Sequence, residues 1–320
     1  MAFEEVGHVN AYAVRCDDGL LLVDCGGAGD PTCEQLLANA VSAAGFSVAE
    51  VHTLAVTHTH SDHVGLAAWV IERSGCSFWM HPNSDHFYDA MRDPDGTAAA
   101  RERRARAEGV PRRLLSSYRD VREETEGALA PVEPDHLLGE GARLPSSLGD
   151  FEVIETPGHC PSHVILYQRE RRLAITGDLV SAAFVPWYDY GYSEDPIAEY
   201  LSALDRLEGL DLEIALPGHG RPLDNVAQAI GEHREGVARR LAETLAAVET
   251  GSSGAYELTR RVFGDPDSDG AGVWQMAETI CYLRHLRSAG AIVREQDDRG
   301  LLSYRLAGRA VATPPRPARA

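Results

Sequence analysis

The stretch THTHSDH, residues 57–63, places four potential metal ligands in one short run of the chain. His58 and His60 are two residues apart, so their side chains can point the same way in a loop. Asp62 and His63 are adjacent and can diverge toward a second centre. Because imidazole and carboxylate groups suit zinc, with iron and manganese as alternatives, this run predicts ligands for two divalent metal ions.

The residues around this run indicate that it connects a strand to a helix. The preceding residues, 51–56, are typical of a buried strand, whereas residues 64–73 have a helical pattern. Three more candidate ligands also close apolar segments that indicate strands: His159 after 151–155, Asp178 after 172–175 and His219 after 213–216. Rigid scaffolds place chemistry at strand ends. We therefore expect all seven side chains to form one two-metal site.

Five motifs follow one another in a defined order along the first two thirds of the chain. They are LVDCG at 22–26, HTHSDH at 58–63, GH at 158–159, GD at 177–178 and PGHG at 217–220. In these motifs the chain resembles the metallo-β-lactamase superfamily, and within it the glyoxalase II-like and lactamase-like thioesterase group. The resemblance implies an α/β fold, an αββα sandwich.

The resemblance also implies a role for each candidate ligand. The first metal would be held by His58, His60 and His159, the second by Asp62, His63 and His219, with Asp178 bridging the two. Asp62 and Asp178 would be the catalytic carboxylates, and Asp24 a structural carboxylate near the site. A metal-bound hydroxide would then attack an acyl carbon.

Domain boundaries are expected from composition and from the same resemblance. Residues 1–226 would form the catalytic domain, with a polar, arginine-rich helical insertion at about 84–130. We interpret the insertion as a solvated, salt-bridged helix pair, or else as a lid or dimer element over the site. His81 and His86, near its start, are expected in a plain loop, with the mouth of the site as the alternative.

The C-terminal region is expected to be a separate module. Residues 227–308 indicate three helices and a hairpin, an order that resembles a winged-helix-like domain, whereas the proline-rich residues 309–320 predict a disordered tail. Its third helix offers few arginines for a DNA groove, so we expect a packing or dimerisation module. A homodimer is therefore considered.

The net charge of the chain limits the kinds of partner that it can bind. The chain has 30 basic and 49 acidic residues, a net charge of −19, and no lysine. The acidic excess falls outside the insertion and the C-terminal region, so the catalytic core would repel a long polyanion such as a nucleic acid. No apolar span approaches the length of a membrane helix, and the acidic start is unlike a signal peptide, so a cytoplasmic location is expected.

The substrate is expected to be a small acyl compound, a thioester, ester or lactone. No histidine or tyrosine is assigned by the sequence as a proton donor, which favours leaving groups that depart without help. The aromatic residues Trp187, Tyr188 and Tyr190, just after Asp178, are candidates for an acyl pocket, although they could equally anchor the insertion. An endoribonuclease or phosphodiesterase of the same fold is the alternative, and a non-catalytic binding protein would require lost ligands.

Overall fold

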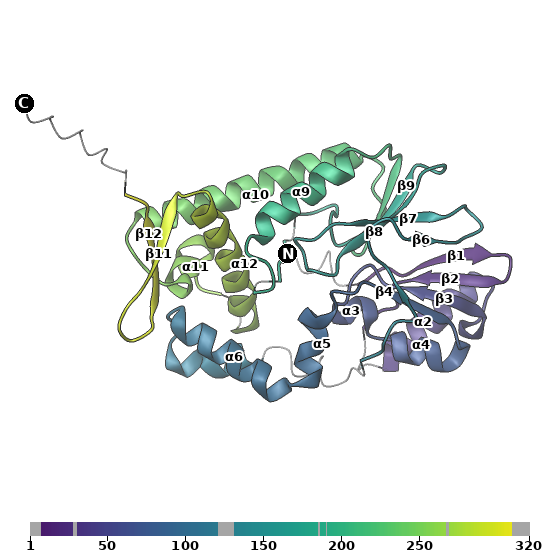
Figure 1. The fold of residues 1–320 in the computed structure, drawn as a ribbon, viewed down its shortest axis with the longest axis horizontal. Helices are drawn as coiled ribbons and strands as arrows, with labels where there is room; N and C mark the ends of the chain where they lie inside the picture. The colour runs from purple at the N-terminus through teal and green to yellow at the C-terminus, as the bar shows by residue number, and fades with distance from the viewer. Residues whose placement is uncertain are drawn as a thin grey trace, which may run out of the picture.

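A computed structural model of the chain describes residues 8–27, 31–120, 131–184, 186–189, 191–266 and 269–308. The expected tail, 309–320, and the end of the expected insertion, 121–130, lie outside the described residues. Within the described part, two five-stranded sheets and a two-stranded hairpin are joined by helices (Figure 1).

The first sheet has the strand order β1-β2-β3-β4-β5, in which β1 is antiparallel to β2 and the other neighbours are parallel. Its strands are Tyr12–Cys16, Gly19–Val23, Val51–Ala55, Ser77–Met80 and His136–Leu137. The second sheet has the order β10-β9-β8-β7-β6, with only β10 and β9 parallel. In chain order its strands are Arg143–Leu144, Phe151–Glu155, Val164–Gln168, Leu173–Gly177 and Ile214–Pro217.

Side chains on β2 alternate between the two faces of the first sheet, and this alternation shows how the sheets and helices stack in layers. Leu21 and Val23 face the second sheet and share a buried core with its strands, whereas Leu20 and Leu22 pack under the helices of the other face. A strand buried on both faces must be apolar throughout, which explains the run from 20 to 23.

Helices cover the outer face of each sheet. The first sheet carries α2 (Pro31–Ala43) and α4 (Ala67–Ser74), and the second carries α9 (Pro196–Glu208) and α10 (Val226–Glu249) (Figure 1). The order helix, sheet, sheet, helix confirms the predicted αββα sandwich. The helix expected at 64–73 is instead split into α3 (Ser61–Val64) and α4, so the end of the ligand run lies in a short helix. A short 3-10 helix, η1 (Val48–Glu50), precedes β3.

The described part of the insertion is helical and packs on the C-terminal helices. It contains α5 (Asp85–Arg92), α6 (Pro94–Ala107), η2 (Arg112–Leu114) and α7 (Leu115–Asp120). Ala105, Val110, Leu115 and Tyr118 share one buried core with the C-terminal region. A solvated helix pair therefore describes only the outer face, where Arg106 pairs with Glu102 at 2.7 Å.

The C-terminal region has the predicted order of elements. The helices α10, α11 (Ala255–Phe263) and α12 (Asp269–Ser288) precede the hairpin of β11 (Ile292–Gln296) and β12 (Leu302–Leu306). Its classification as a winged-helix-like module stays a prediction. α12 also contributes Cys281 and Tyr282 to the core under α9, so this region is continuous with the sandwich.

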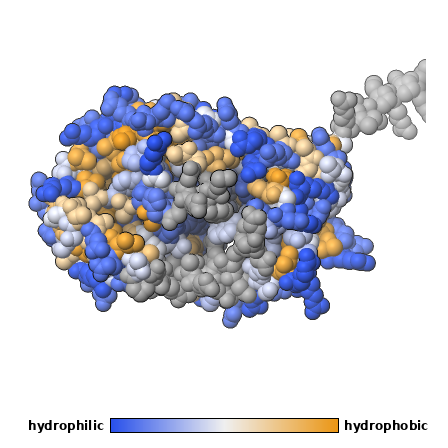
Figure 2. Space-filling model, turned by 180° about the vertical axis from the view of Figure 1, so that it is seen from behind, coloured by the Kyte–Doolittle hydropathy of each residue, from blue (hydrophilic) through white to orange (hydrophobic). Residues whose placement is uncertain are grey.

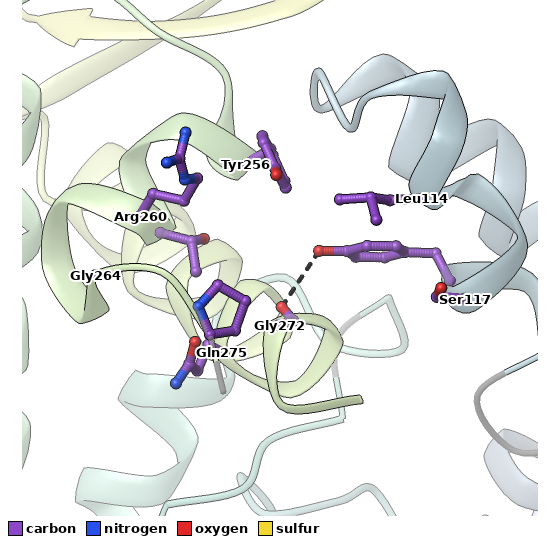
Figure 3. Close-up of a pocket in the computed structure, with 10 residues that line it drawn as sticks. Leu114, Ser117, Tyr256, Arg260, Gly264, Gly272 and Gln275 are labelled. Atoms are coloured by element: carbon purple, nitrogen blue, oxygen red, sulfur yellow. Dashed lines mark hydrogen bonds between the residues drawn. The ribbon is translucent and has the colours of Figure 1, made fainter. Parts of the chain in front are cut away.

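Where α7 meets α11 and the start of α12, the contact between the insertion and the C-terminal helices leaves little free space. In Figure 3, Leu114 and Ser117 face Tyr256 and Arg260 across a cavity of about 30 Å³. The Tyr118 hydroxyl closes it by donating to the Gly272 carbonyl at 3.3 Å. Such a volume holds about one water molecule, so it is a packing gap and not a ligand site.

The visible surface in Figure 2 is mixed, with hydrophilic residues around scattered hydrophobic ones. Large exposed apolar side chains are dispersed among the described elements: Leu36, Leu137, Tyr192, Leu301 and Leu306. Among the residues that the structure describes, no helix combines the length and the apolar character needed to cross a membrane. The expected homodimer stays a prediction.

Candidate metal centre

Three histidine nitrogens converge at the ends of β3 and β7. Nε2 of His159 lies 3.3 Å from Nε2 of His58 and 2.9 Å from Nδ1 of His60. Oδ2 of Asp178, after β9, lies 3.7 Å from the same His159 nitrogen. The structure thus brings together the side chains expected at the first metal.

A second cluster lies on the other side of Asp178. Nε2 of His63 is 3.4 Å from Oδ1 of Asp178 and 3.7 Å from Oδ2 of Asp62. Nε2 of His219, after β10, is 3.2 Å from Asp62 and 3.5 Å from Oδ2 of Asp178. Asp178 therefore faces both groups, as a bridging carboxylate must.

Each of the five histidines uses its outer ring nitrogen to reach an acceptor. The pairs are His58 with the Thr57 hydroxyl oxygen at 3.1 Å, His60 with Asp189 at 2.9 Å, His63 with Asp24 at 2.9 Å, His159 with the Trp187 carbonyl at 3.0 Å, and His219 with the His8 carbonyl at 2.8 Å. The Thr57 hydroxyl itself donates to Asp24 at 2.9 Å, so its oxygen is left to accept. In the neutral rings the outer nitrogens therefore carry the protons. The inner nitrogens of His58, His60 and His159 then present lone pairs to one another, whereas those of His63 and His219 face the carboxylates of Asp62 and Asp178.

Facing lone pairs require a cation between them, and two buried atoms support this reading. Within the described residues, Nε2 of His63 and Oδ1 of Asp178 are buried and have no hydrogen-bond partner. Buried polar atoms without partners are costly. A set of imidazoles and carboxylates arranged in this way fits divalent metal ions.

Without bound ions, the histidines of the two clusters differ in their pKa values. Burial opposes protonation of His63 and His219, but Asp178 and Asp62 outweigh it, raising the pKa of His63 well above its usual range and that of His219 to about 10. In the first cluster burial dominates, and with the neighbouring histidines it lowers the pKa of His58 strongly and that of His159 to about 4. The second cluster therefore attracts positive charge, whereas the first offers neutral ligands.

Glycine at position 218 makes the approach of the strands possible. A Cβ there would lie 2.1 Å from Oδ1 of Asp178 and 2.7 Å from Cε1 of His63. No side chain fits in that gap. This explains in physical terms why a glycine directly precedes His219.

His163 supports the site from behind. Its Nε2 accepts a hydrogen bond from the backbone N–H of Asp178 at 3.0 Å, and its Nδ1 contacts the Thr156 hydroxyl at 2.8 Å. It fixes the loop that carries Asp178. Cys160 lies near the first cluster, but burial raises the pKa of its thiol well above the usual range, and a neutral thiol is a weak ligand.

His86 and Asp189 contact the candidate ligands. The sequence analysis placed His86 at the mouth of the site only as an alternative, and it did not consider Asp189. His86 lies on α5 and is buried, so the expectation of a plain loop is wrong for this residue. Oδ2 of Asp189 contacts both His60 and His86, at 2.9 and 2.8 Å, and His86 continues to Thr59 at 2.9 Å. Sequence separation hides this network, because His86 and Asp189 are 103 positions apart in the chain.

Two cavities flank Trp187. The metal-side cavity, about 50 Å³, is lined by Asp178, His219, Tyr200 and His233 among others. The lateral cavity, about 250 Å³, lies between the insertion, the loop after Asp178 and α12. Trp187 lines both.

The other two aromatic candidates for substrate binding, Tyr188 and Tyr190, differ from Trp187 in their position. Tyr188 is 2% exposed and packs edge-on against Tyr200 and Tyr282, so it belongs chiefly to the core while touching the lateral cavity. Tyr190 lies outside the described residues. Substrate binding by these aromatic residues stays a prediction.

Comparisons with known proteins agree with this geometry. A family model described as the metallo-beta-lactamase superfamily matches residues 5–219. The probable metallo-hydrolase YqjP of Bacillus subtilis (strain 168) is 27% identical over 253 residues, which cover 72% of each chain. The acyl-coenzyme A thioesterase MBLAC2 of Gallus gallus is 32% identical over 92 residues, 28% of this chain and 32% of that one. The crystal structure of a metallo-beta-lactamase family protein from Thermus thermophilus superposes with a TM-score of 0.79 at 25% identity, covering 93% of both chains.

Proposed function

Because the chain belongs to the metallo-β-lactamase superfamily, we propose that it is a metal-dependent hydrolase that cleaves a small acyl thioester, ester or lactone. One observation carries the proposal: two groups of inward-facing nitrogen and carboxylate donors share Asp178. Such an arrangement suits two ions acting on one substrate.

The ions would be held by the residues that converge. His58, His60 and His159 would bind the first, Asp62, His63 and His219 the second, and Asp178 both. Zinc fits this donor set, and iron or manganese are the alternatives. When bound, the ions would polarise the substrate carbonyl and lower the pKa of water to about 7.

The chain's own groups favour a good leaving group. In the metal-side cavity, Nδ1 of His233 is 2.6 Å from the Tyr200 hydroxyl, and its Nε2 accepts from the backbone N–H of Ser181 at 3.2 Å. The Tyr200 hydroxyl also lies 2.8 Å from the Leu179 carbonyl. Both side chains are thus committed to the protein, and burial lowers the pKa of His233. A thiolate or an activated alkoxide departs without a strong acid, whereas an amine needs one.

The thioesterase relative supports this substrate class for a short part of the chain, since the similarity to MBLAC2 spans 92 residues. A phosphodiester is the second candidate, because the same donor set can hold metals for nuclease chemistry. The acidic balance of the chain, −19 overall, disfavours a long polyanion.

The first test is metal content together with a substrate panel. Asp178→Ala should reduce bound metal from two ions to one or none and lower turnover by more than about 100-fold. This loss is larger than that expected for a residue that only hydrogen-bonds to a metal ligand. Asp205→Ala removes an exposed carboxylate paired with Arg234 and should change neither. Elemental analysis and hydrolysis of acetyl thioesters, lactones and single-stranded RNA measure both. An Asp178→Ala protein with two bound ions and full turnover would refute the site, and rapid RNA cleavage without thioester or ester hydrolysis would refute the substrate class.

A further inference from the structure

His86 lies on α5, at the start of the insertion, and its ring reaches the run of candidate ligands at 58–63. The packing of its neighbours fixes this position. Phe87 and Tyr88 are buried in the core on the outer face of the first sheet, together with Val64, which follows the run. His86 is itself buried, so both of its ring nitrogens need partners inside the protein.

One ring nitrogen of His86 connects to the candidate ligand His60 through Asp189. Nδ1 of His86 lies 2.8 Å from Oδ2 of Asp189, and Nε2 of His60 lies 2.9 Å from the same oxygen. Since an ionised carboxylate only accepts hydrogen bonds, both rings donate to it. In the neutral His60 ring, Nδ1 is then without a proton, and this nitrogen faces His159 at 2.9 Å. The contact therefore presents the metal-binding nitrogen of His60 in the required form.

The other ring nitrogen of His86 holds the residue between the first two candidate ligands. Nε2 of His86 lies 2.9 Å from the Thr59 hydroxyl and 2.9 Å from the Ser162 hydroxyl. The Ser162 hydroxyl oxygen also accepts the Thr59 backbone N–H at 3.1 Å. Because Nδ1 carries the proton of the neutral His86 ring, Nε2 accepts from one of these hydroxyls. His86 therefore holds the ligand run at Thr59 as well as at His60.

His81, which precedes α5, is also buried but has different partners. Its Nε2 lies 3.0 Å from a Glu155 carboxylate oxygen, and its Nδ1 accepts a hydrogen bond from the Asn83 backbone N–H at 3.0 Å. Neither partner is a candidate ligand. His81 is thus a matched control for His86. It has the same side chain and a carboxylate partner, but that partner is not the carboxylate bonded to His60.

The connection from His86 to His60 must act in both directions. Hydrogen bonds that orient a ligand raise the affinity for its metal ion, typically by about 10- to 100-fold. By linkage, a metal ion that binds His60 must stabilise the contact of that ring with Asp189, and with it the position of α5. The first metal ion and the start of the insertion are therefore expected to stabilise each other.

We propose that His86 is a positioning residue for the first metal ion. It acts on His60 through Asp189, and it makes binding of this ion and placement of α5 depend on each other. The inference rests on the proposed function, because it concerns the first metal site of that reaction. It gives the insertion a role in holding the metal centre.

The first test measures the cobalt affinity of the full chain by competition with a chromophoric chelator. His219→Ala serves as the background for every variant, because it removes a donor of the second site and leaves those of the first. Two amide variants separate the contacts of His86: His86→Asn keeps a donor at the Nδ1 position, whereas His86→Gln keeps a polar atom at the Nε2 position. His86→Gln should lose about 10- to 100-fold in affinity, and His86→Asn should retain most of it. The control His81→Gln should leave the affinity unchanged.

A double-mutant cycle tests whether His86 acts through Asp189. Asp189→Asn should lower the cobalt affinity, and adding His86→Gln should cause little further loss, because both changes break the same connection to His60. Hydrogen exchange tests the opposite direction. Cobalt should slow exchange of the backbone amides of α5 in the unmodified chain, and much less in His86→Gln. Helix α2, on the outer face of the first sheet, is the reference for global stabilisation.

Circular dichroism of each variant confirms folding, and the exchange measurement on the unmodified chain needs no variant. Equal affinities of His86→Gln and His81→Gln, equal losses in His86→Asn and His86→Gln, fully additive losses in the cycle, or no effect of cobalt on α5 would each overturn the inference. Hydrolysis of an acetyl thioester separates the two proposals. A cobalt affinity that depends on His86 and Asp189, without any thioester or ester hydrolysis, would uphold the positioning role and reject the proposed function. Hydrolysis with a cobalt affinity that His86→Gln leaves unchanged would do the reverse.

Discussion

Asp24 has a backbone φ of 60°, a region that residues other than glycine seldom occupy. Hydrogen bonds of the Asp24 carboxylate stabilise this backbone conformation. The carboxylate accepts from the backbone N–H of Thr57 at 2.7 Å and from its hydroxyl at 2.9 Å, and it lies 2.9 Å from Nδ1 of His63. Strain maintained in this way is characteristic of functional sites, and here it fixes the orientation of a candidate ligand.

Asp24→Asn should therefore weaken binding of the second metal ion while the protein stays folded. Asparagine tolerates a positive φ, but it removes the negative charge that holds His63 in place. The expected loss in affinity is about 10- to 100-fold, measured by competition with a chromophoric chelator. The control Asp18→Asn alters an exposed aspartate that is also 2.9 Å from a histidine, His52, and should have no effect. Equal metal affinity in both variants would contradict a role for Asp24.

At the scale of residues, the sequence predicts the candidate ligands that follow strands and misses partners that only the packing of loops and helices brings to them. The grouping of His58, His60, Asp62 and His63 follows from spacing alone, because a short segment cannot spread its side chains far. Asp189 could not be assigned in the same way, since its contacts with His60 and His86 join residues more than 100 positions apart. Only the packing of α5 against the loop after Asp178 brings them together.

At the scale of elements, Gly158 controls how closely α9 approaches the loop that carries His159. Its φ is 127°, and a Cβ there would lie 2.4 Å from the backbone nitrogen of Tyr200. Gly158→Ala should lower the free energy of unfolding by roughly 2–5 kcal/mol, because steric overlap adds to backbone strain. Urea unfolding measures this change.

Gly231 provides the matched comparison. It lies within α10, and no atom would come within 4 Å of an added Cβ. Gly231→Ala should stabilise the protein by about 0.5–1 kcal/mol, because alanine loses less conformational entropy in a helix. A similar response to both substitutions would show that the close approach at Gly158 is unimportant.

Glu278 makes the contact between α12 and α10 sensitive to pH. Burial raises the pKa of its carboxyl to about 7, although Arg240 opposes the shift. The Glu278 carboxylate and the Arg240 Nε are 3.4 Å apart without a hydrogen bond, so the pair is poorly compensated. The folded state therefore keeps the proton up to about pH 7, whereas the unfolded chain releases it at about pH 4.3, so this group costs stability as pH rises between the two values.

Glu278→Gln should remove that cost. Relative to the unmodified chain, the variant should gain roughly 1–3 kcal/mol in its free energy of unfolding, and so in stability, as the pH rises from 5 to 8. Glu243→Gln is the control, because Glu243 also contacts Arg240, at 2.9 Å, but is 38% exposed. The expected result is a large pH-dependent difference for Glu278→Gln and a smaller one of the same sign for Glu243→Gln, because the Glu243 charge adds to the raised pKa of Glu278. Urea unfolding at both pH values measures both. A pH-independent effect of Glu278→Gln would exclude a raised pKa.

The sequence predicts the helices and strands better than it predicts how they pack against one another. The apolar runs at 20–23 and 151–155 are strands because their residues must be buried, and burial is visible in composition. The break between α3 and α4 was not predicted, because Gly65 has helical φ and ψ and no local signal ends the helix there. The carbonyl of His63, near the end of this first helix, accepts a hydrogen bond from the Cys25 backbone N–H at 2.9 Å, a contact from a different strand end that only the assembled sheet supplies.

At the scale of the whole molecule, the expected division at residue 226 does not coincide with a gap in the packing. Cys281 and Tyr282 of α12 lie in the same core as Ile197 and Leu204 of α9. The insertion shares another core with α11 and α12, and Glu108 adds hydrogen bonds to the start of α11 and to Tyr304 of β12. Sequence composition can mark where a chain changes character, but it does not show which surfaces are later buried together.

The 320-residue chain should therefore unfold as one cooperative unit. Splitting it near residue 226 would expose the apolar residues of α9 that α10 and α12 cover, and this cost couples the regions. Differential scanning calorimetry of the metal-free chain should give a single transition, with equal calorimetric and van't Hoff enthalpies. Metal-free protein is required, because bound ions would stabilise only the part that holds them and could separate transitions that are otherwise coupled. The contrary outcome is two resolved transitions, of which added zinc raises the temperature of the later one and leaves the earlier one unchanged. It would mean that the C-terminal helices form an independent domain. In that case α12 would line the lateral cavity without belonging to the same folding unit.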